Sequence, residues 1–322
     1  MPGALRMGLI IKTMRAKLLY RVGLAIVAGA ILASCSQEVP PYLRPLSKEA
    51  MHLLGTKGMS PKNPIFMRIF KEESELEIWK AREDGHFYHF KTYPICNWSG
   101  ALGPKLRAGD KQAPEGFYSV GRNQMNPNSK YHLSFNLGYP NAYDRLYGRT
   151  GDFLMVHGDC RSAGCYAMTD ALVEEIYALA REAFEGGQKK FEIHAYPFRM
   201  TDENMKRHRA MKWYPFWRQL KEGYDYFELT RIPPKVDVCG GRYMINARFL
   251  NHIGRVDARK ACPTYEKPAP QLWSARPLPG SPLARQAAIP GRKVRNLALE
   301  NRRRYAPRAT RYGLTKAEVV KR

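Results

Sequence analysis

The middle of the chain contains the stretch Val156-His157-Gly158-Asp159-Cys160-Arg161-Ser162-Ala163-Gly164-Cys165-Tyr166-Ala167-Met168-Thr169-Asp170. It places a histidine and a cysteine eight positions apart, with Gly158 directly after the histidine and Gly164 directly before the cysteine. If the segment ran on extended, at about 3.3 Å per residue, roughly 26 Å would separate His157 from Cys165. The two side chains can meet only if the loop folds back, which glycine at both ends permits. The stretch therefore predicts a nucleophilic Cys165 with His157 as its base.

The sequence on either side of this stretch predicts a strand before the loop and a helix after it. The apolar run Phe-Leu-Met-Val at 153–156 is typical of a buried strand, so His157 should lie at a strand end. From about Asp170 apolar residues recur at helical spacing, with Thr169 as the N-cap. The pair Gly186-Gly187 should end this helix.

The remaining ordered part is predicted to be mostly strand. Short runs separated by turn residues predict strands at 65–70, 75–80, 87–93, 117–120, 131–137 and 190–196. In the first of these, apolar residues occupy both alternating sets, which is typical of a strand covered on both faces. A helix over 202–223 should be interrupted at Pro215. The predicted class is mostly β with added helices, an α+β fold with a largely antiparallel sheet.

The cysteine needs help to react, because a free thiol with a pKa of about 8.5 is only a few per cent ionised at neutral pH. Proton transfer to His157 can supply this help, provided that its other ring nitrogen is oriented. We expect a backbone carbonyl in that role, with Asp159 as the polar alternative. The backbone N–H groups of Gly164 and Cys165 are the expected donors to an oxyanion. Candidate substrate-binding residues, each of which could instead be solvated or packed, are Arg161, Ser162, Tyr166, Tyr118 and Tyr139.

Two other interpretations of the cluster stay open. A metal could bind His157, Asp159, Cys160 and Cys165, but zinc sites usually show a Cys-x-x-Cys pair and a second pair elsewhere. No such spacing is present, so we expect no metal and no other cofactor. Alternatively, Cys165 could be half of a disulfide with Cys160.

Residues 1–41 are predicted to be a signal peptide, lipobox and short linker. Basic residues precede an apolar run at 22–33, which is shorter than the roughly 20 residues of a membrane-spanning helix but suits a signal peptide. The sequence Leu32-Ala33-Ser34-Cys35 follows the lipobox pattern, so Cys35 should be lipidated and become the mature N-terminus. An aspartate directly after the lipid-bearing cysteine often indicates retention in the inner membrane, and this chain has Ser36 there. We therefore expect a periplasmic protein anchored to the outer membrane. An ordinary signal peptide or a short anchor with a chance cysteine is the alternative.

Export would place the six cysteines in an oxidising compartment. Setting aside the predicted lipid-bearing and nucleophilic cysteines leaves an even number. We expect one disulfide between Cys239 and Cys262 and another between Cys96 and Cys160, although the sequence alone does not fix the connectivity.

Basic residues gather at the end of the chain, whose formal net charge is +24. From Arg276 to Arg322, thirteen Lys or Arg stand against two Glu. Residues 266–322 are therefore predicted to be a disordered tail, after a catalytic domain at 42–265. Basic tails favour anionic partners, which for an exported protein would be cell-wall polymer or lipopolysaccharide and not nucleic acid. A solvated linker without a partner is the alternative.

Four motifs resemble, in their order, those of a known family. They are Gly109-Asp110-Lys111-Gln112-Ala113-Pro114-Glu115-Gly116-Phe117-Tyr118, Tyr139-Pro140-Asn141, His157-Gly158 and Ser162-Ala163-Gly164-Cys165. Over about residues 60–240 the chain resembles L,D-transpeptidase catalytic (YkuD) domains, and most of all their YafK branch. The resemblance implies a YkuD-type, β-sandwich-like fold with an active-site cleft at one edge.

The resemblance also implies a reaction. Cys165 would attack the peptide carbonyl at the L-centre of the third residue of a peptidoglycan stem, usually diaminopimelate, with His157 as base. The thioester would then pass to an amine, which crosslinks, or to water, which hydrolyses. Implied partners are stem peptides, a peptidoglycan-linked outer-membrane lipoprotein and, through the lipid, the membrane.

Two departures from the family pattern narrow this expectation. Most members carry a histidine two residues before the nucleophile and an arginine two residues after it, where this chain has Ala163 and Ala167. The loop from His157 to Cys165 is also shorter than usual. Both features fit the YafK branch, some members of which look like hydrolases that release lipoproteins from peptidoglycan. A different class is a non-catalytic, lipidated cell-wall anchor, against which the presence of both His157 and Cys165 argues.

Overall fold

The computed structural model describes residues 38–252, 254 and 256–273. The chain divides after Pro40, and the fold described below is that of the part from Pro41 onward. The predicted signal segment, Cys35 and the tail beyond residue 273 lie outside the described residues, so these expectations stay predictions. Within the described ranges, none of the helices has both the length and the apolar character that crossing a membrane requires.

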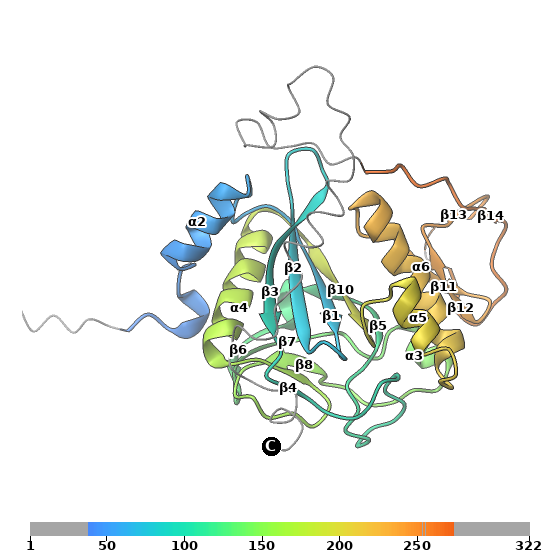
Figure 1. Ribbon diagram of the computed structural model, residues 1–322, viewed down its shortest axis with the longest axis horizontal. Helices are drawn as coiled ribbons and strands as arrows, with labels where there is room; N and C mark the ends of the chain where they lie inside the picture. Colours follow the sequence, from blue (N-terminus) through green and yellow to red (C-terminus); the bar gives the residue numbers. More distant parts are fainter. Residues whose placement is uncertain (1–37, 253, 255, 274–322) are drawn as a thin grey trace, which may run out of the picture. The chain divides into compact units, whose positions relative to one another are not determined.

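The first of two five-stranded sheets holds the centre of the fold (Figure 1). Its strands, in spatial order, are β3 (Phe87–Pro94), β2 (Glu75–Ala81), β1 (Ile65–Phe70), β10 (Lys190–Tyr196) and β5 (Gly116–Gly121). Neighbours are antiparallel except β1 and β10, which are parallel. All six residues of β1 are buried, which confirms the predicted strand with two covered faces.

The second sheet carries the predicted catalytic stretch. Its strands, in spatial order, are β4 (Asn97–Trp98), β9 (Tyr166–Ala167), β8 (Met155–His157), β7 (His132–Asn136) and β6 (Met125–Ser129). Here β8 and β9 are parallel, with Val156 opposite Tyr166 and His157 opposite Ala167. Only residues 158–165 connect these two strands. So short a connection can bring the chain back to a parallel neighbour because β8 has three residues and β9 has two.

The long helix α4 (Asp170–Glu185) joins the two sheets in one apolar core. Its N-cap is Thr169, as predicted, whose side chain accepts the Leu172 N–H. Apolar residues of α4, of one face of the first sheet and of the second sheet belong to one buried cluster, which includes Ile176, Ala180, Met67, Ile69, Phe135 and Val156. The second sheet is thereby fixed on the rest of the fold.

The opposite face of the first sheet packs against α6 (Tyr214–Thr230), so that α4 and α6 lie on the two sides of this sheet (Figure 1). The rings of Phe66 and Phe227 meet there with their centroids 4.7 Å apart. Arg68 is buried on the same face and donates to the carboxylates of Glu77 and Glu228 at 2.8 and 2.7 Å. A buried arginine is stable here because two carboxylates compensate its charge.

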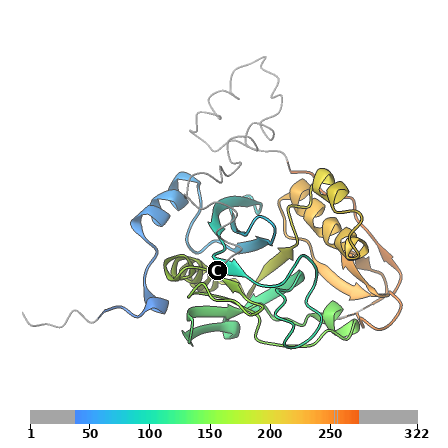
Figure 2. The ribbon, with the colours of Figure 1, turned by 60° about the horizontal axis from the view of Figure 1, so that its bottom comes forward.

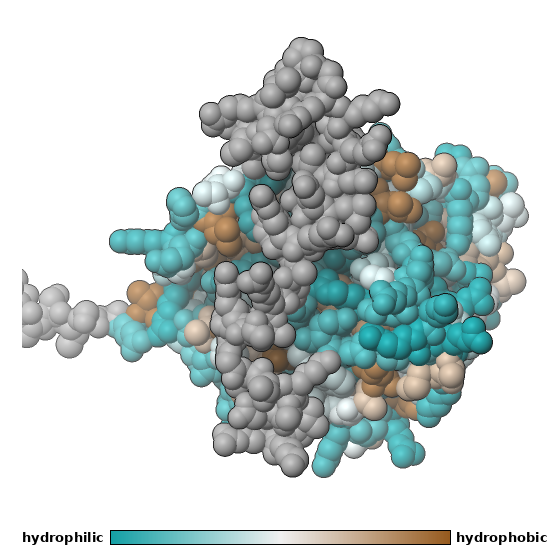
Figure 3. Space-filling model, viewed as in Figure 1, coloured by the Kyte–Doolittle hydropathy of each residue, from teal (hydrophilic) through white to brown (hydrophobic). Residues whose placement is uncertain are grey.

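Shorter elements complete the fold. The remaining helical segments are η1 (Pro41–Leu43), α2 (Lys48–Thr56), η2 (Arg122–Gln124), α3 (Ala142–Leu146) and α5 (Asp202–Arg207). Two small hairpins follow α6, one of β11 (Val236–Cys239) and β12 (Arg242–Ile245), the other of β13 (Arg248–Phe249) and β14 (Tyr265–Glu266). Figure 2 shows the β11–β12 hairpin beside α6. In the described part of the face shown in Figure 3, hydrophilic side chains predominate and apolar ones form smaller patches.

The structure corrects two predicted elements. The strand predicted at 153–156 begins only at Met155, because Phe153 has φ of 51°, in the left-handed region that extended strands exclude. The helix predicted over 202–223 is two helices, and Pro215 lies in the first turn of α6 instead of interrupting it. Proline fits there because first-turn N–H groups need no partner within the helix.

Candidate active site

The parallel pairing of β8 with β9 brings His157 and Cys165 to the same face of the second sheet. Because Val156 lies opposite Tyr166, Cys165 lies beside Met155, and its Sγ accepts the Met155 N–H at 3.4 Å. His157 is two positions further along β8, and alternate residues of a strand share a face. Strand rise and spacing then put the Cα atoms of His157 and Cys165 roughly 8 Å apart. The loop thus folds back as predicted, while the catalytic roles stay predictions.

The imidazole of His157 is buried, at 2% exposure, and held in one orientation. Its Nδ1 lies 2.5 Å from the carbonyl oxygen of Gly158. Because a carbonyl can only accept, Nδ1 must carry the proton, which leaves Nε2 as the base. This confirms the expected backbone carbonyl. The alternative partner, Asp159, instead accepts from Arg161 Nε at 3.0 Å.

Burial sets the protonation of both groups. It lowers the pKa of His157, although Gly158 and Asp159 act to raise it. Burial likewise raises the pKa of the Cys165 thiol, against the Met155 N–H and the charge of Lys105. Both shifts favour the neutral forms. At rest, the site therefore holds a neutral thiol and a neutral imidazole instead of an ion pair.

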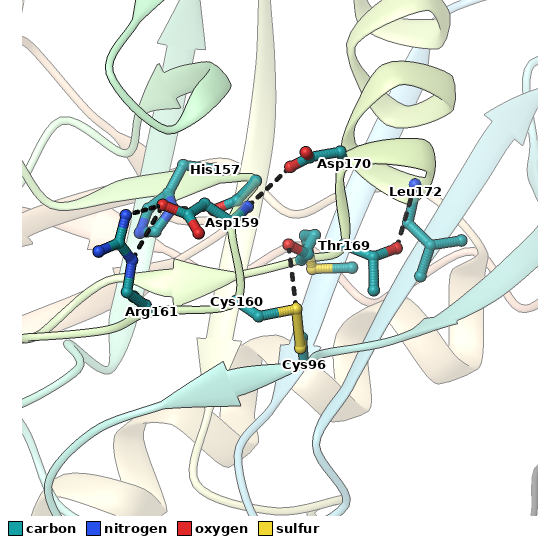
Figure 4. The surroundings of a disulfide bond; sticks show 10 residues. Cys96, His157, Asp159, Cys160, Arg161, Thr169, Asp170 and Leu172 are labelled. Carbon is teal, nitrogen blue, oxygen red and sulfur yellow. Dashed lines mark hydrogen bonds and ion pairs between the residues drawn. A yellow bond between two sulfur atoms is a disulfide. The ribbon is translucent and has the colours of Figure 1, made fainter. Parts of the chain in front are cut away.

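A disulfide fixes the connecting loop (Figure 4). Cys160 is bonded to Cys96, just before β4, with an S–S distance of 2.02 Å. On the other side of the loop, the Asp159 N–H donates to Asp170 Oδ1 at 2.8 Å (Figure 4). The two attachments join the loop to a strand edge and to the start of α4.

The cysteine pairing decides between the disulfides considered above. The disulfides Cys96–Cys160 and Cys239–Cys262 are both present, as predicted. Cys165 is the free cysteine of the described residues, so the alternative Cys160–Cys165 bond is wrong. The Cys96 bond also takes Cys160 out of the zinc set considered above. Over the ranges that the structure describes, no three His, Cys, Asp or Glu side chains cluster as metal ligands.

The loop at 99–115, which includes most of the first family motif, packs behind the nucleophile. A Cβ placed on Gly164 would lie 3.5 Å from the carbonyl oxygen of Gln112. Ser99 Oγ donates to the Lys111 carbonyl at 2.7 Å and lies 3.3 Å from Ser162 Oγ. The position of Cys165 therefore depends on the position of this loop.

A fully buried ion pair, which sequence reasoning missed, holds the loop. Lys71 Nζ lies 3.0 Å from Glu115 Oε1, and both side chains have no exposed surface. The same Nζ donates to three loop carbonyls at 2.8 to 3.0 Å, those of Ala101, Gly103 and Ala113. In turn, Glu115 accepts from the Gly103 N–H and from Trp217 Nε1. One lysine thus connects both ends of the loop.

The turn inside this loop is organised by Asp110. Its carboxylate accepts the N–H groups of Leu106, Arg107 and Gln112 at 2.9 to 3.0 Å. It also accepts from Lys105 Nζ at 2.5 Å. Burial acts to raise the pKa of Asp110, but these hydrogen bonds outweigh it and lower the pKa to about 2.

The three candidate tyrosines are packing residues, which corrects their expected place in the cleft wall. All three are at most 4% exposed, and each hydroxyl donates to a backbone carbonyl. Tyr166 bonds to Pro114, Tyr118 to Glu115 and Tyr139 to Lys105, at 2.5, 3.1 and 3.2 Å. They support the 99–115 loop from behind.

The other candidates lie in the connecting loop. Arg161 is exposed, pairs with Asp159 and stands 5.9 Å from the Tyr131 ring centroid. Ser162 Oγ donates to the Cys165 carbonyl at 2.7 Å and accepts the Gly164 N–H at 3.3 Å. Gly164 has φ of 123°, a conformation that suits glycine. Ser162 therefore holds the loop, whereas Arg161 is exposed and paired with Asp159.

The two alanines that replace family residues differ in environment. Ala163 is exposed, whereas Ala167 is fully buried in β9 opposite His157. An arginine at position 167 would have to enter the core. The cationic side chain whose charge acts to lower the pKa of Cys165 is instead Lys105 of the 99–115 loop.

Comparison with known proteins gives a consistent result. Residues 73–193 match the L,D-transpeptidase catalytic domain (YkuD). The chain is 48% identical over 210 residues to "Putative L,D-transpeptidase YafK" of Escherichia coli strain K12, and the alignment covers 65% of this chain and 82% of that protein. The protein of the same name from Escherichia coli O157:H7 matches equally well.

Solved structures with local likeness are more distant. The helical cell shape determining protein Pgp2 from Campylobacter jejuni is 18% identical with a TM-score of 0.34, over 59% of this chain and 80% of that chain. Bd1075 of Bdellovibrio bacteriovorus is 20% identical with a TM-score of 0.30, over 58% and 65%. The sequence match to YafK and the YkuD match suffice: this chain belongs to the L,D-transpeptidase catalytic domain (YkuD) family.

Proposed function

We propose that the protein is an exported cysteine acyl-transfer enzyme that acts on peptidoglycan stem peptides through a thioester on Cys165. The observation that carries the proposal is the shared face of Cys165 and His157, with Nδ1 of His157 already occupied by Gly158. Family membership supplies the substrate class. A degenerate, non-catalytic wall anchor would have no need for an oriented base beside a free thiol.

The chemistry follows from two neutral partners. As Cys165 Sγ attacks the carbonyl carbon of the third stem residue, its proton passes to Nε2 of His157. The tetrahedral intermediate collapses when that proton moves to the departing amine, which leaves a thioester. Positioned acid and base catalysis of this kind contributes about 10² to 10⁴ in rate.

The oxyanion is expected to bind at the backbone N–H groups of Gly164 and Cys165, where one such donor is worth about 3 to 4 kcal/mol. The Gly164 N–H now contacts Ser162 Oγ at 3.3 Å, which is long for a hydrogen bond. A charged oxyanion would compete well for it.

Water and amine share this thioester, and the second step decides the product. Attack by an amine returns an amide and makes the enzyme a transpeptidase. Attack by water, again with His157 as base, leaves a free carboxylate and makes the enzyme a hydrolase. A peptidoglycan-linked lipoprotein, joined by an amide to the attacked carbonyl, would be the departing amine of the first step. Ala163 and Ala167 do not decide between water and amine, so the proposal includes both second steps.

The location is part of the same proposal. Two disulfides support an oxidising compartment such as the periplasm. Lipidation at Cys35 would then attach the enzyme to the outer membrane. Radiolabelled palmitate should enter the wild-type protein and be absent from Cys35→Ala. Equal label in both proteins would contradict the lipobox.

The test of the reaction uses purified protein with defined muropeptides and with lipoprotein-linked sacculi. We expect mass changes that correspond to hydrolysis or exchange in the wild type and none in Cys165→Ala. Free lipoprotein together with a stem peptide that ends in a carboxylate would identify the hydrolase, and a new amide would identify the transpeptidase. Identical products from wild type and Cys165→Ala would contradict the enzymatic proposal in favour of the anchor.

A further inference from the structure

Phe153 combines two features that are unfavourable in a folded protein. Its side chain is 71% exposed, the highest value among the large apolar side chains of the described residues. Its φ of 51° lies in the left-handed region, which costs a bulky L-residue free energy that glycine avoids. Strained backbone of this kind persists where surroundings impose it, and it gathers at functional sites.

The surroundings of Phe153 are the nucleophile itself. The Cys165 thiol donates to the Phe153 carbonyl at 3.8 Å, while the Met155 N–H donates to the same sulfur at 3.4 Å. Between them, the Leu154 carbonyl accepts the Leu137 N–H, which ties the segment to the end of β7. The backbone at 153–155 therefore wraps the sulfur, and the exposed ring of Phe153 belongs to the residue whose carbonyl contacts it.

A second exposed apolar side chain lies on a segment that is joined to the one before β8. The Thr150 N–H donates to the Leu106 carbonyl at 3.0 Å, which joins the segment before β8 to the 99–115 loop. The side chain of Leu106 is 43% exposed. The side chains of Phe153 and Leu106 thus offer uncovered apolar surface on two joined segments, of which the one with Phe153 contacts Cys165.

We propose that Phe153 is a substrate-contact residue, whose ring packs against the aliphatic side chain of the stem residue that Cys165 attacks. This rests on the proposed function. The methylene groups of a diaminopimelate-like side chain would cover the ring, and its ammonium would be attracted to the aromatic face. Arg161, exposed in the adjoining loop, would exchange Asp159 for a carboxylate of the same peptide.

If Phe153 served only the fold, its replacement by glycine would lower folding stability, and we expect no such loss. At φ of 51°, Phe153→Gly relieves backbone strain and removes little buried surface, because the side chain is 71% exposed, so folding stability should be equal or higher. The sulfur would keep its contact with the residue 153 carbonyl. Only an interaction of the ring with substrate would be lost.

The test measures muropeptide binding directly. In a Cys165→Ala background, we expect Phe153→Gly to weaken the Kd for a defined disaccharide-tetrapeptide about tenfold. Phe153→Tyr should retain wild-type binding. The matched control is Leu229→Ala, which removes a 48% exposed apolar side chain on α6 and should leave the Kd unchanged.

Two further measurements, the alkylation rate of Cys165 and Tm, separate loss of substrate contact from damage to the site or the fold. In proteins that keep Cys165, the iodoacetamide alkylation rate of Phe153→Gly should match that of the wild type within about twofold, and Tm should not fall. A Kd within twofold of the parent, or an alkylation rate that falls while Kd is kept, would overturn the contact. Absence of any muropeptide binding in the parent would overturn it too. Wild-type turnover is measured separately, so failure of the proposed reaction is recognised on its own.

Discussion

The two disulfides of this protein hold regions of different character. Cys96–Cys160 holds the loop between β8 and β9, which lies on a core shared by both large sheets. Cys239–Cys262 holds the hairpins β11 to β14, whose own core is a small cluster around Met244, Ala247 and Val256. The same covalent bond therefore has two uses. In the first region it fixes the loop that places Cys165 near the proposed base His157, and in the second it replaces a core that is too small.

The ion pairs of the two regions differ in the same way. Lys71 and Glu115, behind the nucleophile, have no exposed surface. Arg242 and Glu222, beside the hairpins, are 45% and 36% exposed. A buried pair needs its full set of partners, whereas an exposed pair can exchange them for water. The catalytic region should accordingly tolerate change poorly, and the hairpin region well.

Removing each disulfide gives the largest expected effect. Cys96→Ser with Cys160→Ser should lower the free energy of unfolding by about 4 kcal/mol, and Cys239→Ser with Cys262→Ser by about 3 kcal/mol, because the bonds close loops of 64 and 23 residues. Only the first change should also slow turnover, by about 100-fold, since it frees the loop that places Cys165. Urea unfolding and turnover of folded protein, measured side by side, test this. Equal rate losses in both double variants would erase the distinction.

Breaking the buried pair is expected to have the next largest effect. Lys71→Met leaves Glu115 buried without its partner and should cost about 3 kcal/mol. Arg242→Met, the matched change in the exposed pair, should cost less than about 1 kcal/mol. Urea unfolding gives both values. Adding Glu115→Leu to Lys71→Met should recover part of the stability, and a further loss would show that the pair is not the source of the effect.

The pH dependence sharpens the description of the catalytic region by a smaller effect. Since burial lowers the pKa of His157, its neutral base form should persist as pH falls below the ordinary value of about 6.5. Turnover should thus decline only at lower pH, as the imidazole finally takes up a proton. In His157→Ala, the alkylation rate of Cys165 should rise with pH through an apparent pKa above that of a free cysteine. Reactivity at pH 6 in the wild type that is lost in His157→Ala would mean that the resting site is an ion pair.

The sequence predicted the parts of the site whose signals are local. Glycines at both ends of the 158–164 loop indicated that His157 and Cys165 could meet, and the even cysteine count led to both disulfides. The buried ion pair of Lys71 was not predicted, because a lysine followed by Glu72 looks like a solvated charge. Only the tertiary fold brings Glu115 to it. The exposure of Phe153 was not predicted either, because an aromatic residue at the start of an apolar run is typical of a buried strand.

Tertiary context also explains the remaining errors. Tyr118, Tyr139 and Tyr166 occur in or beside family motifs, and sequence cannot distinguish a tyrosine that lines a cleft from one whose hydroxyl bonds to a loop carbonyl behind it. Pro215 was taken as a helix break because proline interrupts a helix interior. Its harmless place in the first turn depends on where the helix begins, which apolar periodicity locates poorly.

The central claim is that Cys165, activated by His157, carries the acyl group of a stem peptide. It is tested most directly by the intact mass of the protein, quenched in acid soon after mixing with a disaccharide-tetrapeptide. We predict an adduct with the mass of the acyl donor less its departing amine, which maps to Cys165, is absent in Cys165→Ala and forms more slowly in His157→Ala. Product formation with no adduct on Cys165, or an adduct of equal yield in Cys165→Ala, would contradict the claim.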